Sequence, residues 1–146
     1  MLEVTPSLEV RQVAAAGSAS VTEISFRVPA GFPSPAEDLG VKRIDLNEVL
    51  IRHPDATFFV WVRGDSMSLA GICDGDRLVV DRALTPEHGQ VVVAILDGEL
   101  TVKRLYRKNG IVKLQAANPT YPDIRMREAS ELVIWGVVTH CIKSLL

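Results

Sequence analysis

Beyond residue 57, apolar residues gather in short runs that turn-forming residues separate. Runs of this length that are rich in β-branched and aromatic residues are typical of strands. We expect strands at residues 57–63, 77–82, 90–96, 99–106, 111–116 and 131–145. Asp97-Gly98 and Asn109-Gly110 each join two of these runs, and such dipeptides favour two-residue hairpin turns. The sequence therefore predicts a mainly β domain.

Three local signals modify this pattern. Asp45 and Glu48 have the spacing of a capping box at the start of a short helix, and Pro54 follows its expected end. Residues 20–28 alternate imperfectly between apolar and polar positions, which is compatible with a strand laid on a neighbour. Gly136 interrupts the last apolar run and predicts a bulge or bend there.

Residues 1–38 differ from the rest of the chain in composition, since Ala, Ser, Pro and Glu dominate and apolar residues are scattered. Two arginines against five acidic residues give this part a charge of −3, whereas the whole chain carries −2. We interpret it as an extended N-terminal arm on a β-rich domain of residues 39–146. The arm is too acidic for a DNA-binding tail and too short for a helix-turn-helix domain.

The overall composition indicates a single globular domain, with 146 residues, 47% hydrophobic and 23% charged. The chain has no apolar run of the ~18–20 residues that cross a bilayer, and its N-terminus lacks the basic start of a signal peptide. We therefore expect a cytoplasmic protein. Cys73 and Cys141 lie far apart without a CxxC motif or a nearby histidine pair, so neither a metal nor a cofactor is expected.

Candidate chemistry begins at Ser66, which has Gly-Asp turn signals on both sides. A hydroxyl at the end of a strand can act as a nucleophile, and the turn around Asp65 and Met67 can supply N–H groups to an oxyanion hole. The same residues also suit a loop that caps its own turn. No GxSxG motif surrounds Ser66. A base could come from a lysine or from one of three histidines, His53, His88 and His140.

Lys103 differs from the other lysines because it lies in the middle of an apolar strand. In that strand Leu100 and Val102 are expected on one face, and Thr101, Lys103 and Leu105 on the other. A lysine among apolar neighbours loses contact with water, which lowers its pKa and lets the neutral amine accept a proton from serine. The alternative is a solvated lysine on an exposed face of the sheet.

Two segments together resemble the self-cleaving serine–lysine domain of the LexA-type repressors: GDSM…AGI.DGD.LVVD (residues 64–81) and DGELTVKRL (residues 97–105). The resemblance is closest to the UmuD-type proteins of SOS mutagenesis. AGFPSPAEDL and KRIDLNEVLIRHPDATFFVWVRGDSM are similar to that group almost throughout. The resemblance extends from Val28 to the C-terminus, whereas the first 27 residues match nothing in the family.

The resemblance implies roles for the matched residues. Ser66 is the expected nucleophile, Lys103 is the general base, and Ala30–Gly31 is the bond that the protein cuts in its own arm. The implied fold is a mainly β, LexA- and signal-peptidase-like domain with one short N-terminal helix and an extended arm. Pro29, directly before Ala30, is a departure from the family pattern. Its φ is fixed and it has no N–H, so a substrate strand cannot donate a hydrogen bond at this position.

The resemblance also implies partners. These are a second copy in a homodimer, the RecA filament on single-stranded DNA that stimulates cleavage, and a Y-family, UmuC-like polymerase subunit that the shortened product joins for translesion synthesis. Neither sequence-specific DNA binding nor a membrane is expected. Three alternative hypotheses remain: a non-catalytic regulatory dimer, a truncated LexA-like repressor, and a hydrolase of foreign peptides. Cleavage within one chain and cleavage between chains are equally compatible with the sequence.

Overall fold

The computed structural model describes residues 8–12, 20–24, 41–126 and 132–146. In this part of the chain, an eight-stranded sheet has the order β1-β4-β5-β10-β6-β7-β8-β9, and a second sheet pairs β2 with β3. Every pairing of neighbouring strands is antiparallel. The strands are β1 Leu8–Gln12, β2 Ser20–Ile24, β3 Val41–Asp45, β4 Thr57–Val62, β5 Arg77–Asp81, β6 Val91–Leu96, β7 Glu99–Lys108, β8 Ile111–Gln115, β9 Ile124–Arg125 and β10 Val133–Ile142.

The predicted mainly β fold is confirmed, and so are the two predicted hairpins. Asp97 and Gly98 have φ values of 51° and 79°, and Asn109 and Gly110 have 52° and 74°. Two successive residues with positive φ define the type I′ turn, whose twist matches that of the flanking strands. These turns connect β6 to β7 and β7 to β8, which sets the register of the β7 strand that carries Lys103.

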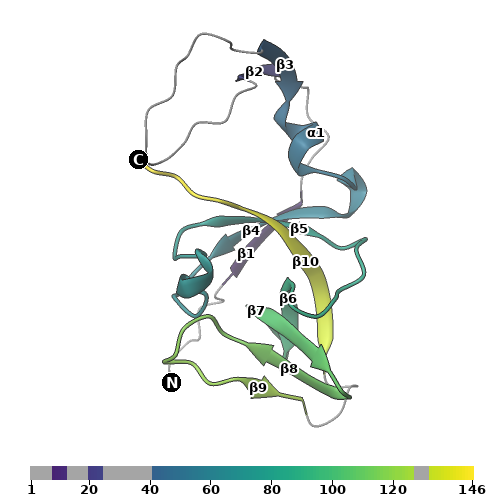
Figure 1. Ribbon diagram of the computed structural model, residues 1–146, viewed down its shortest axis with the longest axis vertical. Coiled ribbons are helices and arrows are strands. Elements are labelled where there is room, and N and C mark those ends of the chain that lie inside the picture. Colours follow the sequence, from purple (N-terminus) through teal and green to yellow (C-terminus); the bar gives the residue numbers. More distant parts are fainter. Residues whose placement is uncertain (1–7, 13–19, 25–40, 127–131) are drawn as a thin grey trace.

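The predicted helix is α1, Leu46–Leu50, and two short 3₁₀ segments follow at η1 Pro54–Ala56 and η2 Ser68–Ala70. Asp45 caps α1 by accepting a hydrogen bond from the Asn47 N–H at 2.9 Å. Figure 1 shows α1 with β2 and β3 at one end of the molecule and β8 with β9 at the other. No helix within the described ranges has the length and apolar character to cross a membrane.

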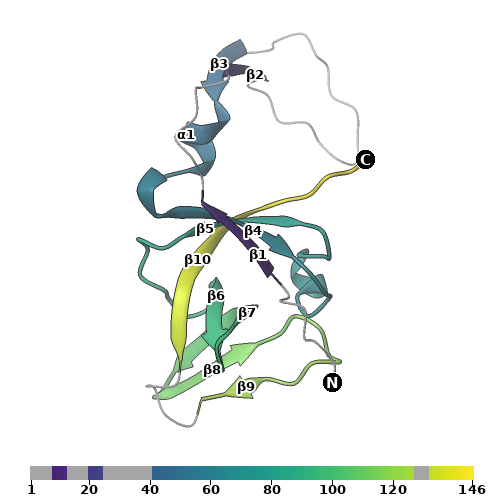
Figure 2. The same ribbon diagram turned by 180° about the vertical axis from the view of Figure 1, so that it is seen from behind.

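Two strands lie within the predicted N-terminal arm. The strand expected within residues 20–28 is confirmed as β2, and it pairs with β3 over five residues. The arm also contributes β1, which sequence analysis did not predict and which runs along β4 at the edge of the large sheet, as Figure 2 shows from behind. Residues 25–40, including the Ala30–Gly31 bond and Pro29, lie outside the described residues.

The core consists of two clusters of buried apolar side chains, which lie on different faces of the sheet. Val92 and Val93 are consecutive in β6, yet they belong to different clusters because successive side chains of a strand point to opposite faces. The sheet therefore buries both of its faces over β6 and β7. A polar residue in the middle of β7 is consequently removed from water, whichever face it takes.

Gly136 produces the irregularity that the sequence predicts, since the β10–β6 register shifts between Ile134 and Gly136. A Cβ atom at this position would lie 2.6 Å from Val80 Cγ1 and 3.3 Å from Arg82 Cγ. Val80 is fully buried and cannot move aside without disturbing the first core cluster. Glycine is therefore required here for close packing of β10 against β5.

We expect Gly136→Ala to lower the free energy of unfolding by about 1–3 kcal/mol, the usual cost of overpacking a core. Urea unfolding of the wild-type chain and the variant measures the difference. The double variant Gly136→Ala/Val80→Ala should lose less than the two single losses together, because Val80→Ala removes the atom that clashes. Strict additivity of the two substitutions would contradict this explanation.

Candidate functional site: a serine turn facing a buried lysine

Ser66 lies in a tight turn between β4 and η2. Gly64, with φ of 94°, starts the turn, and its N–H donates to Asp74 Oδ1 at 2.7 Å. Met67 follows Ser66 and is only 2% exposed, because its side chain belongs to the first core cluster. The buried Met67 side chain thus anchors the turn, and Ser66 stays half-buried at the surface beside it.

The segment between β8 and β9 holds this turn from the other side. The Ala117 N–H donates to the Ser66 carbonyl oxygen at 2.8 Å, and the Leu69 N–H donates to the Ala117 carbonyl oxygen at 2.8 Å. Asn118 Nδ2 donates to the Asp65 carbonyl oxygen at 2.9 Å. These contacts could not be predicted from the sequence, because they join residues about fifty positions apart and no local pattern signals them.

Tyr121 adds a side-chain contact to the same turn. Its hydroxyl donates to Asp65 Oδ1 at 2.6 Å. This hydrogen bond, together with the negative charge of Asp65, raises the pKa of the Tyr121 phenol above its ordinary value. The phenol therefore keeps its proton, and the contact with Asp65 persists in mildly alkaline solution. Asp65, predicted to support the turn, is held here through both its carbonyl oxygen and its carboxylate.

Lys103 reaches the same place from β7. Its Nζ lies 3.0 Å from Ser66 Oγ, 2.9 Å from Thr101 Oγ1 and 3.1 Å from the Val102 carbonyl oxygen. The structure therefore brings together Ser66 and Lys103, the two residues on which sequence analysis concentrated. Thr101, which sequence analysis named only as a neighbour of Lys103 on the same strand face, is a third polar partner.

Burial disfavours the charged form of Lys103. The residue is 8% exposed, and desolvation lowers the pKa of its amine below the ordinary lysine value. Among the described residues, no carboxylate forms an ion pair with it to offset that loss. A neutral amine has two N–H bonds and one lone pair. Thr101 and the Val102 carbonyl can accept the two N–H bonds, which leaves the lone pair for the Ser66 hydroxyl.

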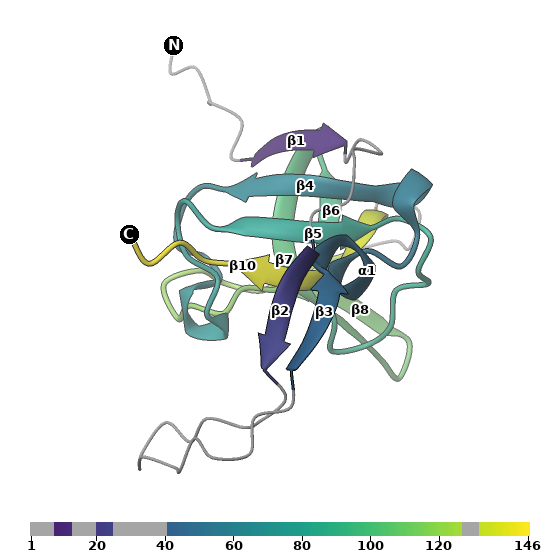
Figure 3. The same ribbon diagram turned by 90° about the horizontal axis from the view of Figure 1, so that it is seen from above.

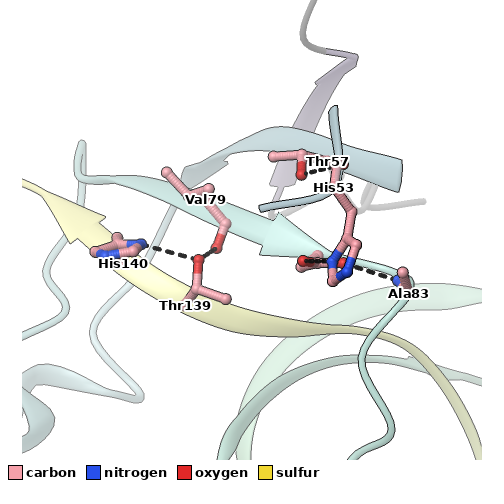
Figure 4. Close-up of polar contacts among 7 residues, drawn as sticks. His53, Thr57, Val79, Ala83, Thr139 and His140 are labelled. Atoms are coloured by element: carbon pink, nitrogen blue, oxygen red, sulfur yellow. Dashed lines mark hydrogen bonds and ion pairs between the residues drawn. The ribbon is translucent and has the colours of Figure 1, made fainter. Parts of the chain in front are cut away.

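The three histidines that sequence analysis kept as alternative bases have other partners. His53 Nδ1 lies 2.6 Å from Asp81 Oδ2, and His140 Nδ1 lies 3.0 Å from Thr139 Oγ1. Figure 4 shows both of these histidines in their own surroundings. His88 Nδ1 accepts the Arg107 N–H at 3.0 Å. Within the described part of the chain, Lys103 is thus the side-chain base in contact with Ser66.

A cleft of about 230 Å³ opens in front of this pair, and Asp65, Ser66, Thr101, Lys103 and Tyr121 contribute to its walls. The N–H groups of Asp65, Ser66 and Met67 donate to no acceptor in the described part of the chain. Such unused donors beside a nucleophile suit an oxyanion hole. The arrangement can therefore activate a hydroxyl, admit an extended chain and stabilise a developing oxyanion.

The two cysteines lie away from this cleft and are free thiols. Desolvation and the nearby Asp76 carboxylate raise the pKa of Cys141 to about 11, so its thiol is a poor nucleophile at neutral pH. No group of three or more histidine, cysteine or acidic side chains is placed to hold a metal ion within the ranges that the structure describes.

Comparison with known proteins identifies the class to which this fold and site belong. The family model described as Peptidase S24-like matches residues 22–139, and the chain belongs to this family of serine peptidases. The chain is 51% identical over 116 residues to protein SamA of Salmonella typhimurium, with 80% of each chain covered. It is 45% identical over 130 residues to protein MucA of Escherichia coli, covering 86% of this chain and 88% of that one.

A repressor is also similar, but over a smaller part. The chain is 48% identical over 86 residues to the LexA repressor of Syntrophotalea carbinolica. This match covers 59% of this chain and 43% of the repressor. The resemblance to the UmuD-type SOS mutagenesis proteins of the LexA-like family is confirmed by the family match together with these relatives.

Proposed function

We propose that the protein is a self-cleaving serine peptidase subunit of the SOS response, which cuts its own Ala30–Gly31 bond with Ser66 and Lys103. The observation that carries this proposal is the 3.0 Å approach of Lys103 Nζ to Ser66 Oγ at a position where the amine is desolvated. A neutral amine beside a hydroxyl is the requirement for lysine-assisted attack by serine.

The proposed reaction has two stages. In the first, the Ser66 hydroxyl proton passes to Lys103 Nζ while Oγ bonds to the Ala30 carbonyl carbon, and the unused N–H groups of the turn stabilise the oxyanion. The Lys103 ammonium then returns the proton to the Gly31 nitrogen, which leaves as an amine. In the second stage, Lys103 takes a proton from water as the water attacks the Ser66 ester. The Lys103 ammonium then returns the proton to Ser66 Oγ as the bond to the acyl carbon breaks, and residues 1–30 leave as a carboxylic acid.

The substrate suits this cleft because it belongs to the same chain. A tethered segment meets the site at a high effective concentration and needs little affinity of its own. The small side chain of Ala30 and the bare Gly31 permit close approach to the half-buried Ser66. Roughly ten residues separate Ala30 from β3, enough to span up to about 33 Å, so the arm can reach the cleft of its own chain or that of a dimer partner.

The proposed partners are those that the resemblance to the UmuD-type proteins implies. In the cytoplasm, a RecA filament on single-stranded DNA favours the docked arm and so accelerates the cut by a shift in population. The shortened homodimer then joins a Y-family polymerase subunit for translesion synthesis.

Intact-mass spectrometry of the purified chain, incubated between pH 7 and pH 10, tests the proposed activity. We expect two products, residues 1–30 and residues 31–146, and faster formation of both when RecA, single-stranded DNA and nucleotide are added together than with DNA alone. A chain that stays intact at every pH and with the filament would overturn the proposal and favour a non-catalytic regulatory dimer. A cut at any other bond would overturn the assignment of the substrate segment.

A further inference from the structure

The outer edge of β4 is covered by a strand from the N-terminal part of the chain. β1 pairs with β4 in antiparallel register, with Leu8 opposite Val62, Val10 opposite Val60 and Arg11 opposite Phe59. Figure 3 shows β1 beside β4 at the margin of the large sheet, with β5 and β10 on the far side of β4. β1 is thus the terminal strand of the sheet on this side.

The main-chain groups that β1 satisfies can be identified from the other edge of β4. Val62 donates its N–H to the Asp76 carbonyl oxygen, and the Ala56 carbonyl oxygen accepts the Arg82 N–H, so these even-numbered residues bond toward β5. Successive residues of a strand direct their main-chain groups to opposite sides. The N–H and C=O groups of Phe59 and Trp61 therefore face β1.

Cleavage at Ala30–Gly31 would separate β1 from the rest of the chain. The released residues 1–30 also include β2, so after the cut two five-residue ladders hold them, β1 on β4 and β2 on β3, without a covalent link to the rest of the fold. Such short strand pairs are marginally stable in water, and the high effective concentration that the link provided is lost. We expect β1 to leave, and its departure exposes a row of unpaired main-chain donors and acceptors along β4. Such an open edge is a template for pairing with another polypeptide.

We propose that self-cleavage converts the outer edge of β4 from an internally covered edge into a docking site for an extended segment of a partner protein, which adds to the sheet as β1 did. This inference rests on the proposed self-cleavage. The full-length chain would then carry its own competitor for that partner, and only the shortened chain would bind it.

β1 indicates the chemistry of the segment that fits. The backbone positions of Leu8, Glu9 and Val10 pair with those of Val62, Trp61 and Val60, so the sequence of β1 reads apolar–acidic–apolar there. The Arg77 guanidinium stacks on the Trp61 ring at 4.1 Å, so a positive charge lies at that position. The edge is therefore expected to select an antiparallel segment that reads apolar–acidic–apolar.

A second copy of β4 is a poorer match for this edge. β4 reads TFFVWV and has no acidic residue to place near Arg77. Pairing two such strands would therefore leave the Arg77 of each copy without an acidic residue on the added strand. These features favour a partner protein over edge-to-edge pairing of two copies.

Amide hydrogen exchange by NMR on the uncleavable Ser66→Ala chain and on the cleaved wild-type chain tests the inference. We expect the Phe59 and Trp61 amides to exchange roughly tenfold faster or more after cleavage. The Phe58 and Val60 amides of the same strand face β5 and should keep their protection. Equal exchange of Phe59 and Trp61 in both chains would overturn the inference, since β4 would then stay covered or would never have been covered.

Two proline variants of the Ser66→Ala chain separate this inference from the proposed function, because neither requires the cut. Arg11→Pro removes an N–H that faces Phe59 and should open the same two amides in the intact chain. Val10→Pro is the matched control, because the Val10 N–H points away from β4 in this register. If both variants behave alike, the pairing of β1 with β4 is not the cause of the protection.

A peptide of residues 5–14 serves as the probe for docking. It should restore protection at Phe59 and Trp61 in the cleaved chain, bind the Ser66→Ala chain at least tenfold more weakly, and lose affinity when Glu9 is replaced by lysine. Absence of binding to the cleaved chain would overturn the docking site. Protection that appears without peptide and grows with protein concentration would show that a second copy takes the edge, and would overturn the proposed partner.

Discussion

Replacing Ser66 with alanine is expected to keep the chain intact under conditions that cut the wild-type chain between Ala30 and Gly31. The substitution removes the only atom that can form the acyl-enzyme in the proposed reaction. Loss of a serine nucleophile costs roughly 10⁶-fold in rate in other serine peptidases, so no product should accumulate over the assay. Intact-mass spectrometry at intervals after a shift to alkaline pH measures the loss.

The fold should tolerate this substitution. Ser66 is half-buried, and Lys103 retains Thr101 Oγ1 and the Val102 carbonyl oxygen as partners when the Ser66 hydroxyl is absent. The melting temperature should therefore stay close to that of the wild-type chain. Ser68→Ala, two positions further along in η2, is the matched control and should be cut at the wild-type rate. A product that begins at Gly31 in the Ser66→Ala chain would show that Ser66 is not the nucleophile.

The strands and hairpins were predictable because their signals are local. Asp97-Gly98 and Asn109-Gly110 require positive φ at two successive positions, and few other dipeptides accept that geometry. The burial of β6 could also be predicted from its own sequence, since a continuous apolar run without alternation is typical of a strand buried on both faces. The same burial of both faces explains why Lys103, in the neighbouring β7, is desolvated and not solvated on an open face.

Other features depend on contacts between residues far apart in the sequence. Nothing in LEVRQ distinguishes an edge strand from any short segment with two apolar residues, and its partner β4 begins 45 positions after β1 ends. The contact of Tyr121 with Asp65 spans 56 positions. Short-range patterns carry no information on such pairings, because the rest of the fold brings the two partners together.

The approach of Ser66 to Lys103 is an intermediate case. The residues are 37 positions apart, so no local pattern joins them. Each was nevertheless identifiable separately: Ser66 by the turn signals that flank it, and Lys103 by its place in an apolar strand. Their pairing came from the family resemblance, and the 3.0 Å approach of their side chains is what the fold adds.

Replacing Lys103 with alanine is expected to slow self-cleavage by about 10²–10⁴-fold, the usual contribution of a positioned general base. Ser66 keeps its place in this variant, because Met67 and the segment around Ala117 hold the turn independently of Lys103. Lys113→Ala is the matched control, since Lys113 lies in β8 and pairs with Asp123 at 3.2 Å, away from the cleft. If Lys103→Ala is cleaved at the wild-type rate, another group must be the base.

The burial of Lys103 also makes the stability of the folded chain depend on pH. Its pKa in the folded chain is below the ordinary value of 10.5, so the unfolded chain binds the proton more tightly. Between the folded pKa and the ordinary value, stability therefore rises with pH, and below that window the buried charge opposes folding. Lys103→Met should accordingly gain melting temperature relative to the wild-type chain at neutral pH and lose that advantage as the pH rises.

The pH dependence of self-cleavage distinguishes a base from a merely positioning lysine. Only neutral Lys103 can accept the Ser66 proton, so the rate should rise about tenfold per pH unit below its folded pKa and level off above it. The hydrogen bond to Asp65 raises the pKa of the Tyr121 phenol above its ordinary value, so this contact persists in mildly alkaline solution. Lys103→Arg retains a long cationic side chain that never deprotonates in this range, and it should be inactive at every pH. A wild-type rate that shows no rise with pH anywhere in the range where the chain stays folded, or cleavage by Lys103→Arg that rises with pH, would mean that the proton of Ser66 goes to a different acceptor.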